Sequence, residues 1–201
     1  MKREKPGTAV QPEQPDRGHG HSELKEILFD SSRKAADMAA TVIGPDPEKF
    51  SHIIRLVLED SYPYSMRAAR VMFLVAERHP DLIRPYLPDL IRGLPDYQTD
   101  GVKRAIGKLL TQLWGDFDEE TTGILVDSCF SWISSREEKV AQKVYAIEIL
   151  YQISAVYPEI KTELISTLEF HMPEATAGLR TAGRKILKKL YRETGPDLPD
   201  E

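Results

Sequence analysis

The chain has 201 residues and a mass of 22.8 kDa, and 41% of its residues are hydrophobic and 29% charged. This composition is typical of a globular domain that forms its own core, and it excludes the disordered and fibrous classes. The net charge of −5 argues against a general nucleic-acid binder, and the single cysteine excludes an internal disulfide framework. No apolar run reaches the roughly 18 residues of a membrane span, so a membrane partner is not expected.

The first expected element is a tail, residues 1–22, rich in proline, glycine, glutamine and charge. Only Ala9 and Val10 in it are aliphatic, so burial cannot offset the entropy of ordering, and we expect a disordered segment. It lacks the apolar core of a secretion signal, which favours a cytoplasmic location. His19 and His21 have no third ligand nearby, so we expect no metal site there.

Residues 23–45 form the next expected element, an N-terminal capping helix region with apolar residues at helical spacing. The pattern fits one long helix or two short helices broken near residues 30–32. Its second half is rich in alanine, which allows close packing against a neighbouring helix. We therefore expect this region to cover the first of the helical hairpins that follow.

From residue 46 onward, glycine, proline and serine breakers separate segments of roughly 12–18 residues. Apolar residues in these segments recur at helical spacing, and none of the segments shows the alternation of a strand. Residues 81–94, 118–133 and 159–171 are each predicted to be the first helix of a pair. The acidic residues Asp118, Glu119 and Glu120 are expected to favour a helix N-terminus rather than to hold a cation.

The predicted second helices share a repeated pattern, which starts with a basic residue and ends with a leucine seven residues later. Successive copies are offset by 36, 40 and 37 residues, and they start at Arg67, Lys103, Lys143 and Arg180. A small residue follows each basic residue: Ala69, Ala105, Ala146 and Ala182. Because a small side chain allows close approach of a neighbouring helix, we expect Ala69, Ala105 and Ala146 to be buried at helix–helix contacts. We expect the basic side chains to reach an aspartate of a preceding turn, Asp60 or Asp96.

This repeat resembles the HEAT family of armadillo-like α-solenoids. The likeness is clearest from Pro85 to Asp96 and at the apolar-basic pair formed by Val102 and Lys103. The third copy departs from the pattern with Arg136 and Gln142, and the fourth has Pro173 in place of the aspartate. The resemblance implies an all-α protein, an α-α superhelix (HEAT-like solenoid) of about four helical hairpins at residues 46–193, with the N-terminal capping helix before it.

The last predicted helix, residues 178–192, carries six basic residues and no acid. Arg180, Arg184, Lys188 and Arg192 step by four and so form one stripe. This stripe fits a docking strip for an acidic partner or a phosphate backbone, and it equally fits the solvated face of a terminal capping helix. An acidic C-terminal tail is expected at residues 194–201.

The sequence contains no motif of a known catalytic, phosphate-binding or metal site, so we expect no enzymatic activity, no cofactor and no metal. Cys129 lies on an apolar row and is expected to be buried rather than nucleophilic. His52, His79 and His171 share no motif and are expected to be structural or solvated. The two tryptophans fit apolar helix faces and are expected to pack in the core: Trp114 and Trp132.

The leading functional hypothesis is a cytoplasmic, non-enzymatic scaffold or adaptor that binds another protein through the surface of its second helices. The candidate partner-binding residues are the repeated basic residues and the final stripe: Arg67, Lys103, Arg104, Lys143, Arg180, Arg184, Lys188 and Arg192.

Two alternatives stay open. The first is a nucleic-acid binder or DNA glycosylase resembling the alkylation-repeat family, in which Lys108 would extend the basic surface and an aspartate would lie beside a tryptophan. The acidic net charge makes this alternative the weaker one. The second is a helical repeat that acts on a tetrapyrrole or another small ligand, for which no residue of the sequence specifies a pocket.

Overall fold

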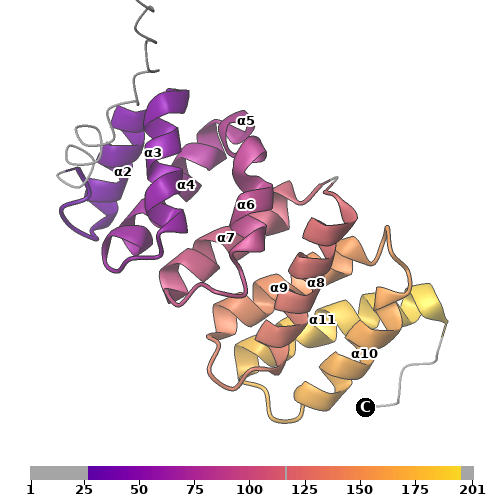
Figure 1. The fold of residues 1–201 in the computed structure, drawn as a ribbon. Helices are drawn as coiled ribbons and strands as arrows, with labels where there is room; N and C mark the ends of the chain where they lie inside the picture. The colour runs from indigo at the N-terminus through magenta and orange to yellow at the C-terminus, as the bar shows by residue number, and fades with distance from the viewer. Residues whose placement is uncertain (1–26, 116, 196–201) are drawn as a thin grey trace, which may run out of the picture.

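A computed structural model describes residues 27–115 and 117–195, and these residues form helices and turns with no strand (Figure 1). The capping helix α2 and the second helices of the hairpins form one layer: α2 (Arg33–Ile43), α4 (Tyr64–Arg78), α7 (Asp100–Leu113), α9 (Val140–Ile153) and α11 (Ala177–Thr194). The first helices form the other: α3 (Pro47–Leu58), α5 (Pro80–Ile83), the 3-10 turn η1 (Arg84–Tyr86), α6 (Leu87–Arg92), α8 (Glu119–Ser134) and α10 (Ile160–His171). The tail predicted at 1–22 lies outside the described residues, as do residues 196–201 of the predicted C-terminal tail.

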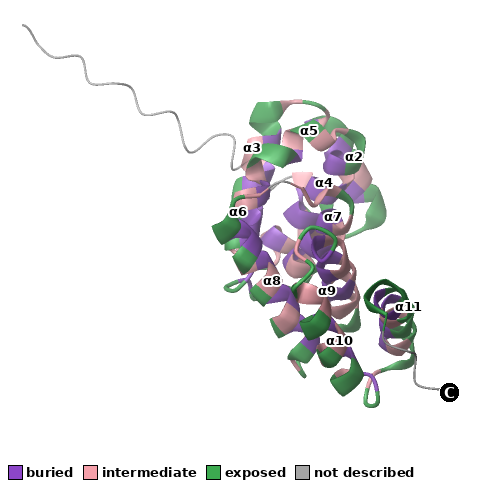
Figure 2. Cartoon of the chain, turned by 90° about the vertical axis from the view of Figure 1, so that its right-hand side faces the viewer, coloured by how far each residue is buried: buried purple, intermediate pink, exposed green. Residues whose placement is uncertain are grey.

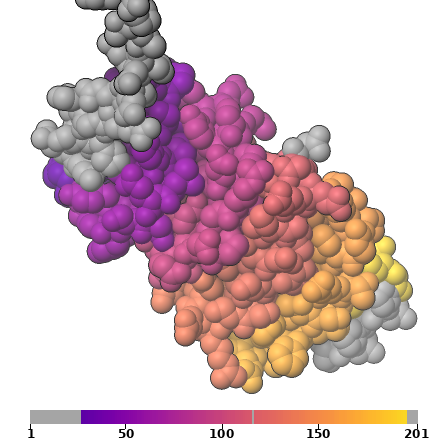
Figure 3. Space-filling model, in the orientation of Figure 1, coloured from indigo at the N-terminus to yellow at the C-terminus, as the bar shows by residue number. Residues whose placement is uncertain are grey.

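The helices stack in chain order, which confirms the predicted all-α solenoid. In the second-helix layer α2 packs on α4, α4 on α7, α7 on α9, and α9 on α11. Pairs such as α3 with α4 and α8 with α9 join the two layers. Figure 2 shows buried residues in the helices of both layers. Successive segments form consecutive bands along the molecule (Figure 3). None of the described helices is long and apolar enough to cross a membrane.

Side-chain caps fix where several helices begin. Ser32 accepts a hydrogen bond from the Ala35 amide at 3.1 Å, which starts α2 just after the break expected near residues 30–32. The Asp118 carboxylate accepts from the Thr121 amide at 2.7 Å and starts α8. The hydrogen bonds from Thr121 lower the pKa of Asp118, as expected for an aspartate that caps a helix N-terminus.

The helix expected at residues 81–94 is instead broken into α5, η1 and α6. Pro85 and Pro88 both lack an amide hydrogen, so neither can donate to a carbonyl of the preceding turn. The chain tightens to 3-10 geometry between them, where Tyr86 packs edge-on against Phe50 of α3 with ring centroids 6.2 Å apart. The spacing of apolar residues therefore predicted the buried face of this segment but not its division into α5, η1 and α6.

The prediction for the small residues of the repeat is right at two of its three positions. Ala69 and Ala146 are fully buried, whereas Ala105 is half-buried, so the prediction was wrong for Ala105. In α7 the close approach takes place at Gly107, where an added Cβ would lie 3.3 Å from Trp132 and Tyr145. Aligning the copies on their basic residue gives the position of each residue along its helix. It does not give the rotation of α7 about its axis, which decides whether Ala105 or Gly107 faces the neighbouring helices.

Replacing Gly107 with Leu should therefore lower the free energy of unfolding by about 1–3 kcal/mol, because a buried side chain there overpacks the contact with Trp132. The better helix propensity of leucine, roughly 1 kcal/mol relative to glycine, offsets part of the loss. Urea unfolding followed by circular dichroism measures the change. Ala105→Leu is the matched control and should lose less, since Ala105 is half-buried. An Ala105→Leu loss equal to that of Gly107→Leu would contradict this assignment of the contact.

Candidate functional site

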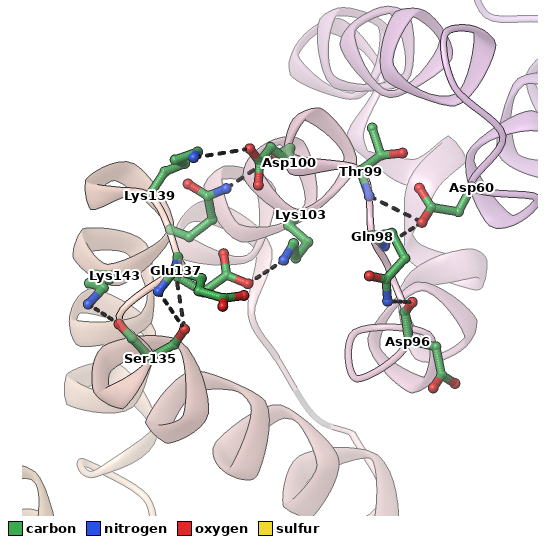
Figure 4. Close-up of polar contacts among 12 residues, drawn as sticks. Asp60, Asp96, Gln98, Thr99, Asp100, Lys103, Ser135, Glu137, Lys139 and Lys143 are labelled. Atoms are coloured by element: carbon green, nitrogen blue, oxygen red, sulfur yellow. Dashed lines mark hydrogen bonds and ion pairs between the residues drawn. The ribbon is translucent and has the colours of Figure 1, made fainter.

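The turns before the second helices are joined to one another at one end of the stack (Figure 4). The Asp60 carboxylate accepts from the amides of Gln98 at 2.5 Å and Thr99 at 3.2 Å, which ties the turn before α4 to the turn before α7. The side-chain amide of Gln142, on α9, donates to the backbone carbonyl of Asp100, on α7, at 3.4 Å and so connects these two helices. These contacts connect three successive second helices.

Three of the four repeated basic residues donate to backbone carbonyls at the ends of neighbouring segments. Arg67 donates to the carbonyl of Leu28 at 2.9 Å and that of Phe29 at 3.0 Å. Lys143 donates to the carbonyls of Ile133 at 3.2 Å and Ser135, and Arg180 to those of Ala175 at 2.8 Å and Pro173 at 3.3 Å. The expectation that these side chains reach an aspartate was wrong, because helix C-termini and turns offer unpaired carbonyls closer by.

The fourth repeated basic residue, Lys103, forms an ion pair with Glu138 of the next turn. Both side chains are 13% exposed, so this pair is largely removed from water, unlike the other ion pairs of the described residues. The sequence did not predict a role for Glu138, because this residue lies in a turn of the third repeat, where the repeat pattern departs from that of the family. Lys103 therefore joins the second repeat to the third.

A groove of about 910 Å³ runs across α2, α4, α7 and α9. Its basic lining residues are Arg33, Arg67, Arg70, Arg104, Lys108 and Lys139. Its acidic lining residues are Asp30, Asp37, Glu77 and Asp100. Four helices separated in sequence thus place charged side chains around one hollow surface, which makes this groove the candidate functional site.

Most of the acids of the groove are already engaged by the chain. Asp37 pairs with Arg33 at 3.7 Å, and Asp100 pairs with Lys139 at 3.9 Å. Asp30 accepts hydrogen bonds from Ser32, which lower the pKa of its carboxyl group and keep it ionised at neutral pH. These three carboxylates are therefore occupied within the fold.

Four of the basic side chains in the groove have no carboxylate partner among the described residues, and one of them, Arg67, is held by backbone carbonyls instead. The other three are Arg70, Arg104 and Lys108. Arg70 makes one long hydrogen bond, 3.4 Å, to the Ser31 carbonyl. The Lys108 ammonium lies 4.0 Å from the centroid of the Phe73 ring, and Arg104 makes no hydrogen bond or ion pair within the described ranges. Among the described residues, the groove therefore presents a positive surface without paired carboxylates, next to Glu77, which has no ion pair there either.

The stripe on α11 lies apart from the groove, whose lining includes no residue of α11. Arg184, Lys188 and Arg192 are exposed and have no ion pair within the described residues, whereas Arg180 is held by carbonyls. Figure 2 shows the outward surface of α11 as exposed along its length. The predicted binding residues therefore divide into Arg67 and Arg104 at the groove, the exposed stripe, and three bonded side chains outside both: Lys103, Lys143 and Arg180.

The cysteine and the two tryptophans, which could serve as a nucleophile or stack on a base, lie away from the groove. Cys129 is fully buried, and burial raises the pKa of its thiol, which disfavours the nucleophilic thiolate. Trp132 is buried, and Trp114 packs edge-on against Phe117 with centroids 6.4 Å apart, and neither ring lines the groove. Within the described ranges no three His, Cys, Asp or Glu side chains come together as a metal site would require.

Comparison with known proteins gives one finding. A family model described as HEAT repeat domain matches residues 24–190, which span α2 to α10 and most of α11. The search of curated proteins and the search of solved structures each gave no significant match.

Proposed function

The chain belongs to the HEAT repeat domain family, and from this premise we propose that it is a non-enzymatic scaffold that binds another protein along the groove. The observation that carries the proposal is the groove itself, in which Arg70, Arg104 and Lys108 have no carboxylate partner in the part of the chain that the structure describes. Side chains that remain uncompensated on a hollow surface are available to a ligand. The scaffold is proposed to act in the cytoplasm.

Binding fits the groove better than catalysis does. A catalytic site needs a nucleophile or an acid–base group placed near a stabilising group, usually with a shifted pKa. The side chain in the groove with a lowered pKa is Asp30, and hydrogen bonds from Ser32 within its own turn account for that shift. The residues around it offer charge, hydrogen bonding and half-buried apolar surface, which are the elements of a recognition surface.

The proposal predicts where partner proteins contact the chain. A photo-crosslinking side chain, p-benzoylphenylalanine, is placed at Ala141, which lines the groove, and in a second variant at Asp127, which is exposed on α8 in the other layer. Irradiation in an extract of the source cells should join discrete proteins to the Ala141 variant and few to the Asp127 variant. Gel electrophoresis and mass spectrometry measure the products.

Two results would count against protein binding at the groove. One is equal labelling from Ala141 and Asp127, which would indicate random encounter rather than a specific surface. The other is nuclease-sensitive crosslinks from Ala141 in place of protein products, which would favour the nucleic-acid alternative.

A further inference from the structure

The charge of the groove indicates the chemistry of its partner. Resting on the proposed function, we propose that the groove binds an acidic, extended segment of another protein, whose carboxylates pair with Arg70, Arg104 and Lys108.

The three basic groups lie on neighbouring faces. Arg104 and Lys108 are four residues apart on α7 and therefore on one side of that helix, and Arg70 lies on α4, which packs directly on α7. The Lys108 ammonium is already positioned over the Phe73 ring, which restricts where it can lie. An extended acidic chain crossing from α4 to α7 would meet all three, and arginine can hold a carboxylate through two parallel hydrogen bonds.

A second observation comes from Gln142, which lines the same groove. Its side chain occupies the repeat position that is apolar in the other copies, namely Met66, Val102 and Leu179. Gln142 is 1% exposed, its amide nitrogen donates to the Asp100 carbonyl, and its Oε1 has no donor among the described residues. A buried acceptor without a donor is unfavourable, so a polar residue at an apolar repeat position suggests a use outside the free chain.

An acidic peptide can supply a hydrogen-bond donor for the Gln142 oxygen and carboxylates for the basic side chains. Its amides can donate to the Gln142 oxygen after a small rotation of that side chain, while its acidic side chains pair with the basic groups. A phosphodiester backbone carries charge but only acceptor oxygens, so it would leave the Gln142 oxygen unmet. Glu77 in the groove has no ion pair with another described residue, and the whole chain carries −5. Both features oppose a polyanion more than a mixed acidic peptide.

The test uses the full chain and three fluorescein-labelled probes followed by fluorescence anisotropy. The first is a peptide of alternating Glu and Ser, the second the same peptide with Gln for Glu, and the third an oligothymidylate of equal negative charge. The acidic peptide should bind with an affinity that falls as salt rises, and the uncharged peptide should not bind. Tighter binding of the oligothymidylate than of the acidic peptide would overturn the proposal in favour of nucleic acid.

Two variants of identical charge change locate the binding surface. Replacing Arg70, Arg104 and Lys108 together with Gln should weaken binding of the acidic peptide by about tenfold, because three exposed charge pairs are lost together. The matched control replaces the α11 stripe residues with Gln: Arg184, Lys188 and Arg192. That control should change the affinity by less than about twofold. Equal losses in both variants, or a loss in the stripe variant alone, would overturn the assignment to the groove.

A third variant tests the peptide backbone separately from charge. Gln142→Leu restores the apolar residue of the other copies, so the melting temperature should stay the same or rise while peptide affinity falls several-fold. Unchanged affinity would remove Gln142 from the site. If the acidic peptide does not bind at all but Ala141 still crosslinks to discrete proteins, this inference fails and the proposed function stands.

Discussion

Replacing Lys103 with Met should lower the free energy of unfolding by about 3 kcal/mol, because it leaves the Glu138 carboxylate unpaired in a largely buried position. Replacing both residues, as Lys103→Met with Glu138→Leu, should recover most of that loss, since no buried charge then remains. Urea unfolding of the two single variants and the double variant measures the coupling between the side chains. A large coupling energy, with the double variant much more stable than the sum of the two single losses predicts, would identify Lys103 as a residue that joins two repeats.

The exposed ion pair one turn away provides the control. Lys139 and Asp100 lie 3.9 Å apart with side chains 66% and 53% exposed, so Lys139→Met should change stability by less than about 1 kcal/mol. If Lys103→Met were as mild as Lys139→Met, Lys103 would be free to serve a partner, as the sequence analysis predicts. The comparison therefore separates a structural role from a binding role for a residue proposed to bind.

Much of the fold could be predicted because its information is local. The basic-to-leucine pattern that begins at Arg67, Lys103, Lys143 and Arg180 located the second helix of each hairpin, and α4, α7, α9 and α11 contain those four segments. The break at η1 was not predicted, because prolines are accepted in the first turn of a helix and forbidden only in its interior. Whether Pro85 and Pro88 start new turns or interrupt one helix depends on packing against Phe50.

The candidate site could be predicted only in part, because a groove depends on how helices far apart in sequence face one another. Arg104 was among the predicted binding residues, and Lys108 appeared only in the nucleic-acid alternative. Arg70 was missed, since one arginine on a helix has no signature until α4 and α7 are placed together. Gln142 did carry a signal, as a departure from the apolar residue of the other copies, and its burial gives that departure a physical meaning.

The structure also separates two regions with different requirements. At the turn end of the stack, Asp60, Lys103 and Lys143 are all engaged in bonds between or within repeats. On the groove face, Arg104 and Glu77 have no ion pair within the described residues. Substitutions at the turn end should therefore change stability first, whereas substitutions on the groove face should change binding with little effect on folding.

The turn aspartate provides the sharpest test of this division. Asp60→Ala should lower the free energy of unfolding by about 2–4 kcal/mol, because two backbone amides of the next repeat lose a charged acceptor. Part of the loss is conformational, since Asp60 has φ of 44°, a left-handed value that alanine adopts less readily than aspartate. Asp60→Gly relieves that strain and isolates the hydrogen-bond contribution, so it should be milder than Asp60→Ala.

Asp96 gives the matched comparison, because it stands at the same repeat position thirty-six residues later and is exposed. Its backbone carbonyl accepts from the Gln98 side chain, a bond that survives substitution of the Asp96 side chain. Asp96→Ala should therefore change the free energy of unfolding by less than about 0.5 kcal/mol. Equal losses at both positions would show that the repeat position itself, rather than the bonds of Asp60 to the next turn, stabilises the stack. A large loss at Asp60 alone would show that two residues with the same place in the repeat have different roles.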